Sequence, residues 1–117
     1  MVKSSVSGRY IPDRGDVVWI SFSPRRGHEQ KGHRPALVLS RRDYSEKTPF
    51  MFCCPITSHV KGYPFEVPVS LKKIRGAILA DQAYTFDWRA RGVRFAGKAP
   101  VALVERVGIL VATIARG

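Results

Sequence analysis

The 117-residue sequence has few acidic residues, few cysteines and no long apolar run. Nine Asp and Glu stand against twenty Lys and Arg, which gives a formal net charge of +11. This excess favours a polyanionic partner, nucleic acid before a membrane surface, over a protein that is basic without such a partner. No apolar segment approaches the ~20 residues that a transmembrane helix needs. The N-terminus lacks the apolar core of a secretory signal, so we expect a cytoplasmic protein with no membrane partner.

Cysteine and histidine are too sparse for the common catalytic and metal-binding patterns. Cys53 and Cys54 are adjacent in an apolar segment. Neighbouring strand residues point to opposite faces, so we expect reduced core thiols. The three histidines, His28, His33 and His59, have no carboxylates or cysteines at ligand spacing, and we predict neither a metal site nor a cofactor. The sequence also lacks a nucleophile elbow and a phosphate-binding glycine pattern, which weighs against those enzyme classes.

The apolar fraction of 44% fits one folded domain of modest size. We expect a flexible arm over residues 1–14 and a single domain over 15–117. Apolar segments between polar loops predict strands, and apolar residues at helical spacing predict one terminal helix over 101–115. The expected strands cover 16–22, 34–40, 50–56, 63–69, 77–82 with a continuation to 86, and 94–98; short helical turns are expected in 41–48 and 88–91. This pattern predicts a mainly β fold, a small, strongly bent antiparallel barrel with short helices.

Chemically versatile side chains gather in residues 27–40, GHEQKGHRPALVLS. A polar loop bounded by Gly27 and Gly32 runs directly into an apolar strand that follows Pro35. Loops anchored by rigid strands often carry functional sites, although a solvated turn before a core strand would have the same composition. A second polar loop, residues 57–62, follows another apolar segment.

These loops contain groups suited to cleavage of RNA without a metal ion. RNA carries its own nucleophile, the 2′-hydroxyl, so an enzyme needs to position it, accept its proton, protonate the leaving 5′-oxygen and stabilise charge on the phosphate. Four residues of the two loops offer suitable groups: Glu29, His33, Arg34 and Thr57. Their spacing in the sequence does not show that the loops meet.

Several stretches, in matching order, make the chain resemble the MazF/PemK family of toxin endoribonucleases. They are RYIPDRGDVVWISF (9–22), GHEQKGHRPALVLS (27–40), CPITS (54–58), KGYPFEV (61–67), LADQ (79–82) and WRAR (88–91). The resemblance implies a barrel of the CcdB/PemK plasmid-toxin type, a homodimer, and sequence-specific cleavage of single-stranded mRNA that inhibits translation and growth. It implies 2′,3′-cyclic phosphate and 5′-hydroxyl ends. It also implies a cognate antitoxin with a flexible acidic tail, and contact with operator DNA only through that antitoxin.

The resemblance also assigns roles to individual residues. The family's two principal catalytic residues correspond to Arg34 and Thr57, its active-site glutamate corresponds to Glu29, and His33 precedes Arg34 as in close relatives. The family's arginine is cast as a proton-transfer group, but a pKa above ~12 makes arginine a poor base. We therefore predict that Arg34 clamps the scissile phosphate and that Thr57 orients it. Glu29 or His33 is then the better base. Glu29 could alternatively brace the loop through a salt bridge with Arg34.

Further residues are candidates for RNA contacts, although a surface or packing role fits each of them equally well. Phosphate contacts are expected from Arg25, Lys31, Lys61 and Arg89, base stacking from Phe22, His59 and Tyr63, and amide contacts from Gln30 and Gln82, with Gln82 reading a base edge. Trp19 and Trp88 fit the core or a dimer interface better than an RNA surface.

Two other functions remain open from the sequence. The first is a toxin on the same barrel that binds a protein such as DNA gyrase without cutting RNA. The combination of Glu29, Arg34 and Thr57 weighs against it, because a pure binder does not need these groups. The second is a non-catalytic nucleic-acid-binding barrel, which the net charge permits equally well.

Overall fold

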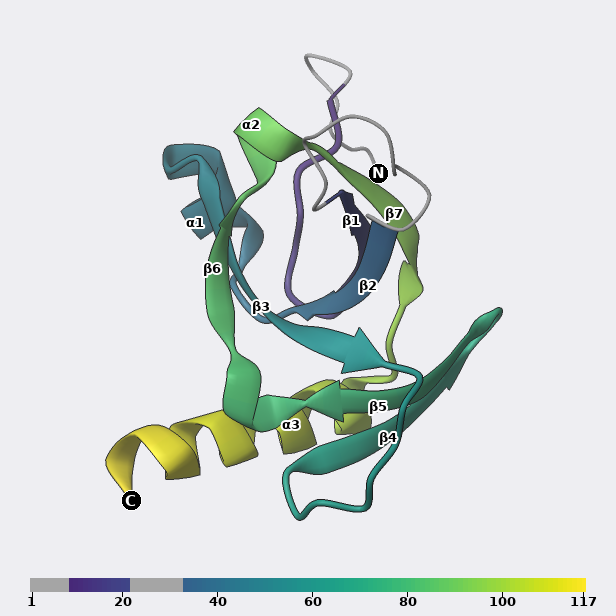
Figure 1. Cartoon of the computed structure of the whole chain (residues 1–117). Helices are drawn as coiled ribbons and strands as arrows, with labels where there is room; N and C mark the ends of the chain where they lie inside the picture. Colours follow the sequence, from purple (N-terminus) through teal and green to yellow (C-terminus); the bar gives the residue numbers. More distant parts are fainter. Residues whose placement is uncertain (1–8, 22–32) are drawn as a thin grey trace.

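The computed structural model describes residues 9–21 and 33–117 and shows one antiparallel sheet with short helices and a C-terminal helix (Figure 1). The elements in chain order are β1 (Asp16–Ser21), β2 (His33–Val38), α1 (Arg42–Lys47), β3 (Phe50–Thr57), β4 (Glu66–Leu71), β5 (Ile74–Leu79), the 3₁₀ turn η3 (Ala80–Gln82), β6 (Tyr84–Asp87), α2 (Trp88–Arg91), β7 (Val93–Lys98) and α3 (Val101–Arg116). The predicted mainly β fold with a terminal helix is confirmed.

The sheet is a strongly curled half-barrel. Its strands follow the order β4-β5-β3-β2-β1-β7, and β6 pairs with β3. β4 and β7 stand at the two ends of this order, yet the curl brings them close to each other. A Cβ added to Gly97 of β7 would lie 3.0 Å from the side chain of Leu71 of β4. The bent sheet therefore encloses its core although the strand order itself has two ends.

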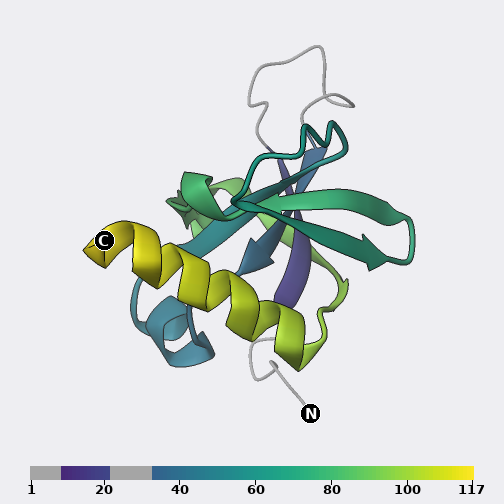
Figure 2. The ribbon, with the colours of Figure 1, turned by 90° about the horizontal axis from the view of Figure 1, so that it is seen from below.

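The central strands bury side chains on both faces of the sheet. Val17 and Leu37 belong to a hydrophobic cluster that includes Val104 and Val107 of α3. The other face carries a second cluster, whose members are Val18, Ile20, Ala36, Val38, Met51, Cys53, Phe86 and Trp88. Figure 2, which views the molecule from below Figure 1, shows α3 running across the sheet in front of the strands. None of the helices in the described part of the chain is long and apolar enough to cross a membrane.

The two cysteines are free thiols buried on opposite faces, as the alternation along a strand predicted. Cys54 belongs to the α3-covered cluster and Cys53 to the other. Burial raises the pKa of each thiol to about 12. Both thiols are therefore protonated at neutral pH and serve as packing groups rather than nucleophiles.

The largest differences from the predicted elements lie between residues 63 and 86. β4 begins at Glu66 rather than at 63, because a turn closes there with a hydrogen bond from the Glu66 N–H to the Tyr63 carbonyl, 3.1 Å. The expected strand over 77–86 is instead β5, η3 and β6. The chain breaks at η3 because the two strands pair with different halves of β3: β6 with residues 50–53 and β5 with residues 56–57.

Of the flexible arm expected over residues 1–14, residues 1–8 lie outside the described residues, and residues 9–14 pack against the sheet. Pro12 is fully buried. The Tyr10 hydroxyl donates to the carboxylate of Asp16, and burial together with this carboxylate raises the pKa of Tyr10. Asp16 also pairs with Lys98 of β7, N–O 2.6 Å. This segment therefore connects the start of β1 to the end of β7.

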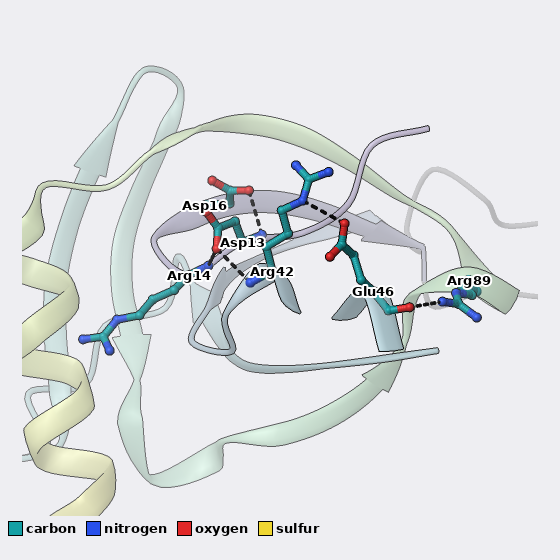
Figure 3. Close-up of polar contacts among 6 residues, drawn as sticks. All are labelled: Asp13, Arg14, Asp16, Arg42, Glu46 and Arg89. Atoms are coloured by element: carbon teal, nitrogen blue, oxygen red, sulfur yellow. Dashed lines mark hydrogen bonds and ion pairs between the residues drawn. The ribbon is translucent and has the colours of Figure 1, made fainter. Parts of the chain in front are cut away.

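A second set of polar contacts connects the entry segment to α1 and α2 (Figure 3). The Asp13 carboxylate accepts a hydrogen bond from the backbone N–H of Arg42, 2.9 Å, at the start of α1. One turn later, Arg42 pairs with Glu46 at 3.3 Å. The backbone carbonyl of Glu46 accepts a hydrogen bond from the Arg89 guanidinium, 2.8 Å. These contacts hold α1 and α2 together at the edge of the sheet.

Candidate active site at the ends of strands β2 and β3

Arg34 and Thr57 lie at the same end of two neighbouring strands. The antiparallel pairing of β2 with β3 ends with the pair Ala36–Pro55. Arg34 lies two residues beyond Ala36, and Thr57 lies two residues beyond Pro55. The strand register therefore puts Arg34 and Thr57 at the same end of the β2–β3 pair.

Both side chains also belong to the same face of the sheet. Alternation along β2 puts Arg34 on the face of Ala36, and alternation along β3 puts Thr57 on the face of Cys53. Ala36 and Cys53 belong to the same hydrophobic cluster. Arg34 is exposed and Thr57 is half-buried. A guanidinium and a hydroxyl therefore reach the surface on one face, at one end of the strand pair.

His33 occupies a different position from the one expected for a base beside Arg34. It is exposed, begins β2 and pairs with Ser21 of β1. Because His33 is next to Arg34 in a paired strand, the His33 side chain points to the opposite face of the sheet. The face shared by Arg34 and Thr57 therefore lacks His33, which makes His33 the less suitable of the two candidate bases.

The Thr57 hydroxyl oxygen is already engaged as an acceptor. It receives a hydrogen bond from the backbone N–H of His59, 3.0 Å. A hydroxyl oxygen that accepts in this way keeps its own hydrogen for donation. The hydrogen of the Thr57 hydroxyl is therefore still available for donation to another acceptor.

One carboxylate shapes the loop that follows Thr57. Glu66 accepts hydrogen bonds from the backbone N–H of Gly62, 2.8 Å, and from that of Lys61, at 3.1 and 3.2 Å to its two oxygens. The loop carries His59, Lys61 and Tyr63, all exposed. Tyr63 is 60% exposed, which is unusual for a large aromatic side chain and leaves its ring available for stacking. The loop therefore combines a cation and aromatic rings on a fixed backbone.

Glu66 shapes this loop but is not among the site residues predicted from the sequence. A signal was present, because Glu66 is the single acidic residue between Glu46 and Asp81. A lone carboxylate in a basic segment, just after a glycine-containing loop, is a candidate acceptor for backbone N–H groups.

Arg89 and Gln82 lie apart from this group. The Arg89 guanidinium lies 5.6 Å from the Trp88 ring centroid and donates to α1, so it is held beside the start of β3, where Phe50 pairs with Asp87. Thr57 ends the same strand, about 20 Å away along its length. Gln82 is exposed in η3, beside the middle of β3. The structure therefore does not gather these two residues with Arg34 and Thr57.

Five predicted site residues lie outside the described residues: Phe22, Arg25, Glu29, Gln30 and Lys31. Their roles stay predictions. Within residues 9–21 and 33–117, no three His, Cys, Asp or Glu side chains gather as a metal-binding group.

Comparisons with known proteins agree on one family. The family model described as a PemK-like, MazF-like toxin of type II toxin–antitoxin systems matches residues 13–114. The chain is 52% identical over 84 residues to the endoribonuclease toxin MazF of Escherichia coli (strain K12), covering 72% of this chain and 76% of that protein. The crystal structure of MazF from Deinococcus radiodurans superposes with a TM-score of 0.81 at 41% identity, covering 93% of this chain and all of the other. A MazE–MazF structure from the same organism gives 0.83 at 39% identity, covering 92% and 98%.

Proposed function

Since the chain belongs to the PemK-like, MazF-like toxins of type II toxin–antitoxin systems and is an endoribonuclease of that family, we propose that it cuts single-stranded mRNA by attack of the RNA's own 2′-hydroxyl. The observation that supports this mechanism is the placement of Arg34 and Thr57 on one face at one end of the β2–β3 pair. A guanidinium and a hydroxyl donor so placed suit the charge that develops on a phosphate during cleavage.

In the proposed reaction the 2′-oxygen forms a bond to phosphorus while the bond from phosphorus to the 5′-oxygen breaks. The products are a 2′,3′-cyclic phosphate and a 5′-hydroxyl. Arg34 holds the non-bridging oxygens, and Thr57 donates its hydroxyl hydrogen to one of them. The departing 5′-oxygen takes up a proton from water to become the 5′-hydroxyl, and the 2′-hydroxyl gives up its proton to an acceptor. Glu29 suits this role better than His33, because alternation along β2 turns His33 away from the face of Arg34.

The loop after Thr57 supplies contacts for the neighbouring nucleotides. In the proposed complex, Lys61 binds a phosphate, and His59 and Tyr63 stack on bases. Glu66 keeps the loop backbone in one conformation through its bonds to Lys61 and Gly62. The net charge of +11 draws the RNA toward this surface.

Cleavage without a metal ion tests this proposal. We expect the chain to cut a long single-stranded RNA equally well with and without EDTA, because no step of the mechanism uses a bound ion. The measurement compares product bands over time in matched reactions. Activity that chelation removes and magnesium restores would contradict the mechanism, and RNA binding without any cleavage would indicate a non-catalytic barrel.

The proposed protein partner is a cognate antitoxin with a flexible acidic tail that covers the RNA-binding surface. The chain resembles MazF as found in MazE–MazF structures. An acidic segment also complements a protein with twenty Lys and Arg. On the family's pattern, operator DNA is reached only through the antitoxin.

We further propose a symmetric homodimer. The terminal helix α3 leaves large apolar side chains in solvent, with Val101 76% and Ile109 64% exposed. A two-fold contact between copies would cover such a surface. Light scattering at micromolar concentration is expected to give twice the chain mass of 13.1 kDa. A monomer mass under these conditions would contradict the proposed dimer.

A further inference from the structure

Gly76 of β5 lies against the backbone of Thr57, and we propose that it is a positioning residue for the Thr57 hydroxyl. The inference rests on the proposed catalytic role of Thr57. Because position 76 has no side chain, the end of β3 can lie close to β5 and hold the Thr57 hydroxyl in the position that cleavage requires.

The contact between the two residues is a backbone contact. Ala77, the next residue of β5, pairs with Thr57. A Cβ added to Gly76 would lie 1.9 Å from the carbonyl oxygen of Thr57 and 2.9 Å from its carbonyl carbon. It would also lie 3.1 Å from the Cα of Ser58. All three atoms are main-chain atoms, so no side-chain rotation can relieve the overlap.

The end of β3 is the part that must move. Real Cβ contacts are essentially never shorter than 3.0 Å, so the strands would have to separate by roughly 1 Å. Strand β5 is held by β4 along its whole length, including the pair Val69–Gly76. Strand β3 is paired with β2 only as far as Pro55, so beyond this residue its hold within the described sheet is β5 itself. Thr57 would therefore shift, together with its hydrogen bond to His59.

A second glycine provides a matched control for backbone strain alone. Gly76 has a φ of +156° and Gly92 a φ of +85°, and both conformations disfavour a residue with a Cβ. A Cβ at Gly92 would meet no atom within 4 Å. Gly92→Ala thus introduces conformational strain without steric overlap, whereas Gly76→Ala introduces both.

We expect Gly76→Ala to slow single-turnover cleavage at saturating RNA by about 10²-fold, since a misplacement of about 1 Å at a reacting group has this size of effect. The affinity for an uncleavable 2′-deoxy analogue should stay close to that of the wild type, because the cations that bind the RNA are unchanged. Gly92→Ala should cleave at the wild-type rate. Thermal unfolding of each variant shows that the comparison is made between folded proteins.

A double-mutant cycle with Thr57→Ala separates positioning from a general structural role. If Gly76 acts through Thr57, then adding Gly76→Ala to Thr57→Ala should change the rate little, because the group that it positions is already absent. Losses that multiply, a wild-type rate for Gly76→Ala, or a Gly76→Ala chain that does not fold would each overturn the inference. A fully active Thr57→Ala would instead overturn the proposed catalytic role of Thr57, and with it the role of Gly76.

Discussion

Replacing Arg34 by lysine is expected to lower the single-turnover cleavage rate by about 10²–10³-fold, which corresponds to roughly 3–4 kcal/mol of transition-state stabilisation. Lysine keeps the positive charge but loses the planar guanidinium, which can donate two parallel hydrogen bonds to phosphate oxygens. The interaction matters most when charge builds on these oxygens, so the loss should appear in the rate at saturating RNA. Affinity for RNA should fall far less, because many other cations contribute to binding.

The measurement pairs single-turnover cleavage of a short RNA with binding of its 2′-deoxy analogue. Arg41→Lys is a matched control, because Arg41 is an exposed arginine beyond the other end of β2 whose guanidinium pairs with Asp43 at 3.3 Å. It should cleave like the wild type. If Arg34→Lys cuts at nearly the wild-type rate once saturated with RNA, then Arg34 only docks the substrate and its assignment is wrong.

The parts of the fold that depend on local patterns were predictable. Apolar spacing predicted the terminal helix over 101–115, and the structure shows α3 over Val101–Arg116. Alternation predicted the opposite burial of Cys53 and Cys54. The break between β5 and β6 was not predictable in this way, because it depends on which half of β3 each strand pairs with. Such a choice is made by contacts distant in sequence and leaves no periodic signal.

The candidate site was also predictable from the sequence only in part. The family's motifs identified Arg34 and Thr57, but the register of β2 and β3 was needed to show that they lie at one end of the sheet. The expected strand began at Arg34, so only the structure, in which β2 begins at His33, shows that His33 and Arg34 point to opposite faces. The role of Gly76 could not be recognised from the sequence. It depends on the close approach of Gly76 to the backbone of Thr57, which lies nineteen positions earlier in the chain.

The proposed nucleophile can be removed from the substrate without any change to the protein. If the 2′-hydroxyl attacks the phosphate, then one 2′-deoxy sugar on the 5′ side of the cut removes the attacking group and leaves every protein residue unchanged. Cleavage at that position should then fall below detection. Binding should persist, because the phosphates and bases that contact the loop after β3 are still present. A metal-activated water, by contrast, would cut both substrates.

Attack by the 2′-hydroxyl can be tested with two short RNAs that differ at one sugar. The cut site is first mapped on the all-ribose strand, and both strands are then incubated with the chain in EDTA. We expect complete cleavage of the all-ribose strand, a product whose 5′-hydroxyl a kinase labels directly, and no cut at the 2′-deoxy position. Comparable cleavage of both strands, or a product that carries a 5′-phosphate, would contradict it.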